Sequence, residues 1–222
     1  MRLTCLLIPA FFCPLSLWAQ ANKTPAYNAS AWIDIMPRGS FNDWTRVAIP
    51  PDKALDPVSQ WSVDKARGVV ICTGDHGHEW LRYDRELANF ILHVEWRFIK
   101  GEGLKGYNSG VFIRNSANGR VWHQAQVGAG NDGYLFGQTL LDGKVTEMKF
   151  APKPKVNRIN PPGEWNTYEI RCQGPEITLW VNGGVSSEFS APEVLMGYLG
   201  LEAEGFRIEF RKLKLKLLPG RI

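Results

Sequence analysis

The segment that most limits how this chain can fold is Phe90–Ile99, which reads FILHVEWRFI. Apolar and polar residues alternate along it, and alternate side chains of a β-strand lie on the same face of a sheet. One face would carry the apolar side chains of a core: Phe90, Leu92, Val94, Trp96 and Phe98. The segment therefore predicts a long strand with one buried face.

The other face of this strand carries His93 and Glu95, two residues apart and side by side. A histidine and a carboxylate in this arrangement suit a binding or reactive surface, and they also suit a solvated face with an internal ion pair. The sequence leaves both interpretations open.

The composition favours further strands rather than helices. The 222 residues include nine Trp, eleven Phe, six Tyr, 22 Gly and 14 Pro, which suits strands joined by turns. Hydrophobic residues make up 44% of the chain, enough for the core of one large domain. In the last expected strand, Phe206–Leu217, the apolar positions shift phase near Arg211 and Lys212, as they would at a β-bulge. We expect an all-β sandwich.

A hairpin is predicted within Tyr107–Gly137. Two short alternating runs, Gly110–Arg114 and Trp122–Val127, are joined by a connection rich in Asn, Ser and Gly. One face of this hairpin would combine aromatic, amide and guanidinium groups, namely Phe112, Arg114, Trp122, Gln124 and Gln126. Such a mixture suits a polar ligand with flat faces, of which sugar is the obvious case. It also suits an amide and cation network that ties two strands together.

The first 21 residues have the pattern of a secretory signal peptide. Arg2 precedes an apolar run, Leu3–Trp18, and cleavage is expected after Ala19 or Ala21. The run is interrupted by prolines and short for a membrane span. We expect an exported protein, periplasmic or secreted, with no membrane attachment after cleavage. Residues 22–39 would form a flexible lead-in and residues 40–222 a single domain.

The charge pattern argues against nucleic acid as a partner. Removal of residues 1–21 takes away Arg2 and no acid, so the net charge falls from +4 to +3. The basic residues are scattered, whereas nucleic-acid binding needs a patch or stripe of positive charge. Cys72 and Cys172 remain after cleavage, either as a disulfide or as two buried thiols.

Two His and two acids lie within Gly74–Glu79, which reads GDHGHE. Imidazole and carboxylate together suit transition metals, although no third His lies at a motif spacing and Gly-rich polar loops are common without metal. The sequence calls for no cofactor and assigns no metal ligand, and a divalent metal is left open. A Walker glycine pattern, a GxSxG nucleophile elbow and a CxxC pair are absent from the sequence.

Three groups of residues together resemble a family of exported bacterial proteins, the 3-keto-disaccharide hydrolase domain family, formerly a domain of unknown function. The similarity extends over roughly residues 40–217, and its motifs are Asn108–Arg114, Gly163–Asn166 with Trp180–Gly183, and Gly197–Leu201 with Phe210–Leu213. The resemblance implies a concanavalin A-like jelly-roll sandwich of two antiparallel sheets, whose concave face receives carbohydrate. It also implies relatives that act on oxidised glycosides. In these, a 3-keto group acidifies the neighbouring C–H and the glycosidic bond breaks by elimination and rehydration.

Two positions depart from the family pattern. Members typically have Glu-x-Gln followed closely by Asp, where this chain has Gln124-Ala125-Gln126 and no acid before Asp132. A glutamine cannot accept a proton as a carboxylate does. The family's Leu-Gln-x-His-Gly appears here as LEAEG, with Glu204 in place of the histidine.

Two functions are therefore open, an enzyme with a rearranged acid/base set and a carbohydrate-binding module that has lost the chemistry. In the enzyme, the catalytic candidates are Glu202, Glu204 and His123, with His93 as a further candidate. The expected ligand-binding residues are Asn108, Arg114, Trp122, Gln124, Gln126, Tyr134, His93 and Glu95. The sugar, its linkage and the oligomeric state are not predicted.

Overall fold

The computed structural model describes residues 31–130, 132–149, 154, 156–191 and 193–220. The expected signal peptide lies outside the described residues. Fifteen strands are formed and none of the described residues is helical, so this part of the chain contains no helix that could cross a membrane.

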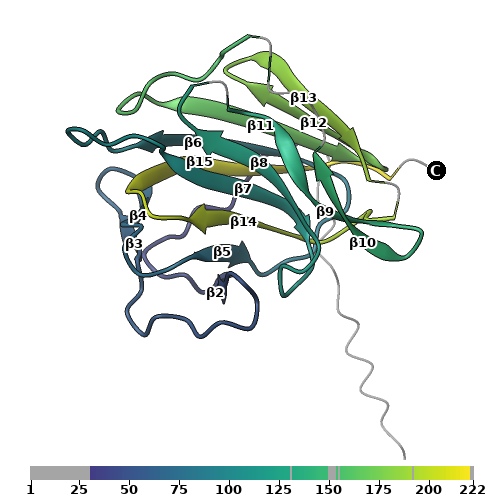
Figure 1. Cartoon of the computed structure of the whole chain (residues 1–222), viewed down its shortest axis with the longest axis horizontal. Coiled ribbons are helices and arrows are strands. Elements are labelled where there is room, and N and C mark those ends of the chain that lie inside the picture. Colours follow the sequence, from purple (N-terminus) through teal and green to yellow (C-terminus); the bar gives the residue numbers. More distant parts are fainter. Residues whose placement is uncertain (1–30, 131, 150–153, 155, 192, 221–222) are drawn as a thin grey trace, which may run out of the picture.

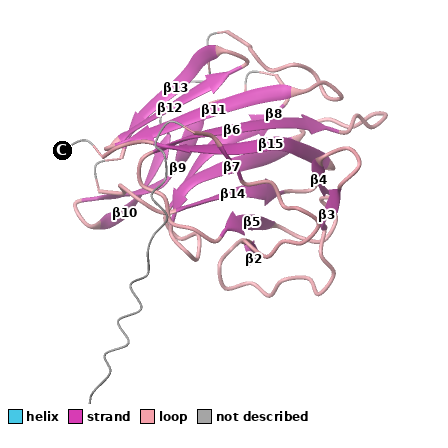
Figure 2. Cartoon of the chain, turned by 180° about the vertical axis from the view of Figure 1, so that it is seen from behind, coloured by secondary structure: helices cyan, strands magenta, loops and turns pink. Residues whose placement is uncertain are grey.

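The strands form two antiparallel sheets that lie one over the other (Figures 1 and 2). The eight-stranded sheet has the order β13 (Gly184–Ser190), β12 (Glu176–Val181), β11 (Asn166–Gln173), β6 (Phe90–Phe98), β15 (Ile208–Leu217), β4 (Val69–Cys72) and β3 (Trp61–Asp64), and β1 (Ile33–Asp34) also pairs with β15. The seven-stranded sheet has the order β10 (Lys144–Lys149), β9 (Leu135–Leu141), β8 (Trp122–Gly128), β7 (Asn108–Asn115), β14 (Tyr198–Ala203), β5 (Glu79–Tyr83) and β2 (Trp44–Ala48). The predicted jelly-roll sandwich is confirmed.

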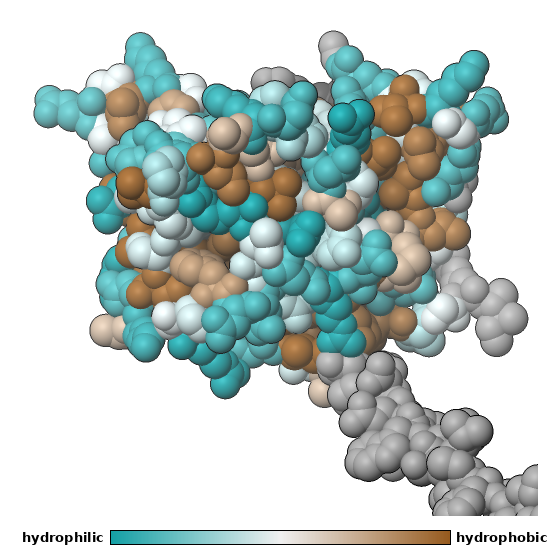
Figure 3. Space-filling model, turned by 90° about the horizontal axis from the view of Figure 1, so that it is seen from below, coloured by the Kyte–Doolittle hydropathy of each residue, from teal (hydrophilic) through white to brown (hydrophobic). Residues whose placement is uncertain are grey.

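The core lies between the two sheets, and the alternation of the sequence explains which side chains enter it. The five apolar residues predicted for the inner face of β6 are all buried. On β11 and β12, Tyr168, Ile170 and Cys172 lie opposite Val181, Leu179 and Ile177, and all six are buried in the same core. On the exterior, apolar surface is broken up by hydrophilic side chains in the view from below (Figure 3).

Register shifts occur at three strand pairs of the described residues, and two of them, in β15 and β7, bear on the sequence predictions. The predicted bulge in β15 is confirmed: Arg211 pairs with Glu95 and Lys214 with His93, so β15 has one extra residue, and Lys212 takes a φ of 50°. A second bulge was not predicted. On β7, Phe112 pairs with Gly200 and Asn115 with Tyr198, with the extra residue again on one strand only.

The ordered domain begins earlier than residue 40. Ile33 and Asp34 pair with Leu215 and Lys214 of β15, and the backbone of Ile35 donates a hydrogen bond to Leu213. The later part of the expected lead-in is therefore a short edge strand.

Cys72 and Cys172 are free and buried. They lie on β4 and β11, with β15 and β6 between them. Neighbouring strands are about 4.8 Å apart, so three steps across the sheet already separate the two strands by about 14 Å, twice the reach of a disulfide. The register adds to this distance, because Cys172 is level with Phe90 and Cys72 with Phe98, at opposite ends of β6. Of the two alternatives, the structure contains the buried thiols.

Candidate functional site

A pocket of about 720 Å³ opens on the outer face of the seven-stranded sheet. Its floor consists of side chains that β5, β7, β8, β9 and β14 direct away from the core. The end of β2 and the residues that follow it, 48–52, form a wall. The pocket has an ionisable end and an aromatic end.

Three ionisable side chains meet at one end of the pocket. Glu202 on β14 is only 3% exposed, and its Oε1 lies 2.9 Å from Nε2 of His78, which precedes β5. Glu204, two residues further along, is half-buried on the same face. Ligand atoms of the three side chains all lie within 4.8 Å of one another. The arrangement can transfer protons, and it is a donor set that can hold a metal ion.

The pKa values of Glu202 and His78 are both raised, but for different reasons. Burial raises the pKa of Glu202 and the nearby charge of Glu204 raises it further, against the hydrogen bonds from His78 and Gln124. Burial opposes protonation of His78, but the hydrogen bond and the charges of Glu202 and Glu204 outweigh it and raise the pKa of the ring. Because both pKa values are raised, Glu202 and His78 keep their protons to a higher pH than the same groups would in water.

A chain of amides fixes the other oxygen of Glu202. Gln124 donates from Nε2 to Glu202 Oε2 at 2.9 Å and to Gln126 Oε1 at 3.2 Å, and Gln126 donates in turn to Asn108 Oδ1. The Gln124 side chain crosses β7 at Gly110, where a Cβ atom would lie 2.3 Å from its Nε2. Glycine at this position therefore allows the amide to reach the carboxylate.

Four aromatic rings form much of the rest of the floor, together with the amides of Asn115 and Gln138. The indole of Trp122 contacts Phe136 at 5.2 Å and Phe112 at 6.2 Å, both edge to face, and Phe112 contacts Trp80 at 5.5 Å. A row of four rings thus crosses the sheet. The Trp80 ring lies over Gly200, where a Cβ atom would come within 2.4 Å of it. Trp80 and Phe112 are buried, whereas Trp122 and Phe136 are partly exposed, and exposed aromatic faces suit the apolar faces of sugar rings.

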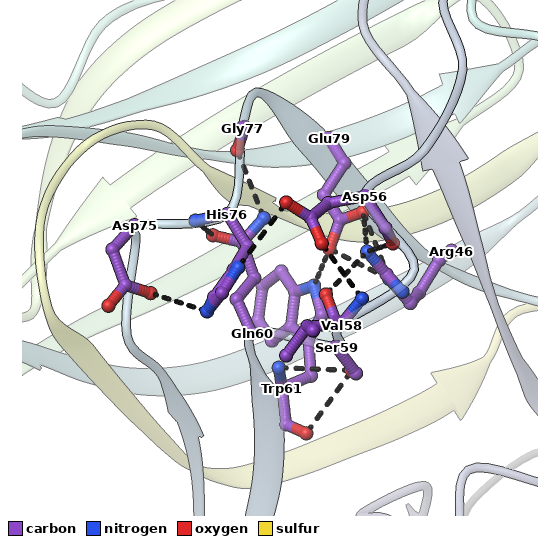
Figure 4. A network of polar contacts seen from close by, with 10 residues as sticks. All are labelled: Arg46, Asp56, Val58, Ser59, Gln60, Trp61, Asp75, His76, Gly77 and Glu79. Atoms are coloured by element: carbon purple, nitrogen blue, oxygen red, sulfur yellow. Dashed lines mark hydrogen bonds and ion pairs between the residues drawn. The ribbon is translucent and has the colours of Figure 1, made fainter.

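Glu79, the residue that follows His78 in the chain, forms an ion pair with Arg46 (Figure 4). The carboxylate of Glu79 accepts hydrogen bonds from the Arg46 guanidinium at 3.0 Å and from the indole of Trp61 at 2.9 Å. Arg46 also donates to the backbone oxygen of Asp56, whose side chain lies 3.4 Å from Nδ1 of His76. The predicted GDHGHE cluster is thus divided, with His78 in the pocket and Glu79 in the support below it.

Six of the predicted site residues line the pocket together: Glu202, Glu204, Asn108, Trp122, Gln124 and Gln126. Sequence reasoning did not place His78, Trp80 or Phe136 in the site. His78 and Trp80 are two residues apart, so the period of two that identified other strands would have placed them on one face. Their meeting with Glu202 depends on the pairing of β5 with β14, which no local pattern indicates.

The placement expected for Arg114 is wrong. Its φ of 50° at the β7 bulge turns the side chain away from the pocket face that Phe112 occupies. The guanidinium is 0% exposed and donates to the backbone oxygens of Ala88, Gly174 and Val194. Arg114 therefore joins three segments of backbone and does not face a ligand in the pocket.

His123 and Tyr134 also lie outside the pocket. His123 is on the inner face of β8, where its Nδ1 donates to Ile113 O at 3.2 Å and its Nε2 accepts from the Thr139 hydroxyl at 3.0 Å. Burial lowers the pKa of this ring to about 4. Tyr134 precedes β9 and contacts Phe136 at 5.5 Å without lining the pocket. A catalytic role for His123 does not fit this placement.

His93 and Glu95 lie on the outer face of the other sheet, so they cannot meet Glu202. Glu95 Oε2 accepts a hydrogen bond from Arg211 at 2.6 Å and its Oε1 accepts one from Lys212 at 2.8 Å. His93 lies 3.5 Å from Glu169. Of the two interpretations offered for this face, the structure contains the ion-pair network.

The comparison with protein families identifies the chain. The model of the 3-keto-alpha-glucoside-1,2-lyase-like domain matches residues 31–216. The chain belongs to this family. No curated protein sequence matches it significantly.

Solved structures with low sequence identity share the fold of this family member. A putative glycosyl hydrolase from Parabacteroides distasonis has 17% identity and a TM-score of 0.59, over 86% of this chain and 96% of that one. The carbohydrate binding module CBM66 from Bacillus subtilis has 14% identity and a TM-score of 0.59, over 78% and 95%. The Bacillus licheniformis beta-glucanase has 9% identity and a TM-score of 0.54, over 85% and 98%.

Proposed function

We propose that the protein is a carbohydrate-active enzyme that cleaves 3-keto-glycosides in this pocket by elimination. The observation that carries the proposal is the convergence of His78, Glu202 and Glu204 at one end of a pocket whose floor is aromatic. Aromatic faces support a sugar ring while ionisable groups act at its edge. Membership of a family described as keto-glucoside lyase-like agrees with this chemistry.

The reaction needs a proton acceptor and a group that stabilises an oxyanion. A ketone at C3 acidifies the hydrogen on C2; loss of that proton and cleavage of the C1–O bond give an unsaturated keto-sugar, and the leaving oxygen takes up a proton. Water can then add across the new double bond. We assign the acceptor role to Glu204, which is half-buried in the pocket and has no hydrogen bond among the described residues. The His78–Glu202 pair would face the developing oxyanion.

A carbohydrate-binding module is the second candidate. It is favoured by the amide of Gln124, which occupies the centre of the floor and can bind sugar hydroxyls without any chemistry. In either case we propose that the ligand is a carbohydrate and that the protein is exported.

The test is an assay of the mature protein with 3-keto-disaccharides and with the same sugars unoxidised, in which the leaving sugar and the unsaturated product are followed by chromatography. We expect cleavage of the oxidised sugars only, and loss of turnover in Glu204→Gln. Glu188→Gln is a matched control, because Glu188 is exposed on β13 of the other sheet. Saturable sugar binding by calorimetry without any cleavage, with and without added divalent metals, would instead support the binding module.

A further inference from the structure

The buried glutamates of this protein differ in whether an arginine pairs with them. Four glutamates are buried, and three of them have a permanent cation as partner. Glu79 pairs with Arg46 at 2.8 Å, Glu209 with Arg97 at 2.9 Å and Glu95 with Arg211 at 2.6 Å. The protein thus supplies a guanidinium wherever such a charge is buried for structural reasons.

Glu202 is the fourth, and its surroundings are different. No Lys or Arg among the described residues forms an ion pair with Glu202 or with its neighbour Glu204. Among the described residues, the side chains that hydrogen-bond the Glu202 carboxylate are the imidazole of His78 and the amide of Gln124. A buried carboxylate beside a second carboxylate is costly unless a cation is added.

The geometry of these side chains suits a metal ion as that cation. One imidazole nitrogen and two carboxylate oxygens, all within 4.8 Å, come from the adjoining ends of two neighbouring strands: His78 directly precedes β5, Glu202 lies on β14 and Glu204 directly follows it. Ligand atoms about 2.1 Å from one transition-metal ion lie about 3–4 Å apart, so a small rotation of the Glu204 carboxylate is enough to close the set. The amide of Gln124 holds Glu202 in orientation, as the outer partners of metal ligands commonly do.

We propose that His78, Glu202 and Glu204 bind one divalent transition-metal ion. Three protein ligands leave open positions, and these face the pocket, as at metal sites that bind a substrate or activate water. Oxygen atoms of a carbohydrate reach the ion from that side. Glu204 can bind the ion through one oxygen and keep the other for a proton, so the site is compatible with both functions proposed above.

Metal binding is measured on the mature, metal-stripped protein with Mn²⁺ alone as the probe, by the loss of the electron paramagnetic resonance signal of free Mn²⁺. We expect one Mn²⁺ per chain, displaced by Zn²⁺, and an affinity at least about tenfold weaker in Glu204→Gln and in His78→Gln. The matched controls are Glu188→Gln and His93→Gln, which change the same residue types outside the pocket and are expected to bind as the wild type does. Circular dichroism shows whether each variant is folded.

Two results would overturn the proposal. One is wild-type protein that leaves Mn²⁺ free up to millimolar concentration and is not stabilised against heat by Zn²⁺. The other is binding that is equal in the wild type and in folded His78→Gln, a half-buried position where substitution is expected to preserve the fold. Because no sugar is present, the outcome is separate from that of the cleavage assay: a protein that binds Mn²⁺ but cleaves nothing contradicts only the proposed enzyme.

Discussion

Gly110 determines how Gln124 lies in the pocket. A methyl group at this position would come within 2.3 Å of the Gln124 amide nitrogen and would push the side chain off Glu202. Gly110 has no positive φ, so alanine adds the collision without a strained backbone. Gly110→Ala is therefore a specific probe of the amide that orients the buried carboxylate.

We predict that Gly110→Ala and Gln124→Ala lower turnover to a similar degree. Each removes a hydrogen bond to a charged group, worth about 1.5–3 kcal/mol, or about 10- to 100-fold in rate. The measurement is kcat/KM for a 3-keto-glycoside in the two single variants and the double variant. We expect the double variant to match Gln124→Ala, because both changes act through one contact. Additive losses would show that Gly110 matters for another reason.

At the scale of elements, the support under the loop before β5 is the contact to test. Glu79 begins β5, lies directly after His78 in the chain and joins β2 to β3 through Arg46 and Trp61. The same Arg46 binds the loop after β2 through the backbone oxygens of Asp56 and Val58. One buried carboxylate thus fixes two of the segments that border the pocket.

We predict that Glu79→Gln destabilises the protein and also weakens the site. Glutamine can still accept from the Trp61 indole but leaves the Arg46 guanidinium without its charge partner, a change that costs about 3–5 kcal/mol at buried pairs. Urea unfolding measures the loss of stability. Mn²⁺ affinity measured well below the unfolding transition shows whether His78 has moved; an affinity equal to that of the wild type would mean that the support does not position His78.

The elements also show which parts of the fold a sequence can predict. β6 was identified from alternation alone, because it buries one complete face in the core. Alternation failed at Arg114, where a single left-handed residue moves a side chain to the other face of the strand. The β15 bulge was predicted because apolar residues lie on both sides of it and make the shift visible. β7 ends in Arg114 and Asn115, so no apolar residue beyond its bulge reveals the shift.

At the scale of the whole molecule, the site is assembled by contacts that are distant in sequence. His78 and Glu202 are 124 residues apart and meet only because β5 and β14 are neighbours. The family resemblance indicated the Glu202–Glu204 strand end but could not supply His78, since the sequence around it resembles an ordinary polar loop. The sandwich thus separates two polar faces, a pocket on one sheet and an ion-pair network on the other.

Between these faces, His123 couples the stability of the whole sandwich to pH. Burial lowers its pKa to about 4 in the folded protein, against about 6.5 in the unfolded chain. Between these values the unfolded state binds a proton that the folded state does not, so stability is complete above pH 6.5 and falls as the pH is lowered through 4. At pH 4.5 this one residue lowers the free energy of unfolding by about 2–3 kcal/mol.

We predict that His123→Gln, which retains a side chain able to hydrogen-bond Thr139, is less stable than the wild type at pH 7 and loses less stability between pH 7 and pH 4.5. The pKa values of His78 and Glu202 are raised, which increases stability in acid in both proteins. The test is therefore the difference in free energy of unfolding between the wild type and His123→Gln at each pH. Urea unfolding at both pH values measures it. Parallel pH profiles would mean that His123 is protonated in the folded core, in conflict with the hydrogen bond that its Nε2 accepts from Thr139.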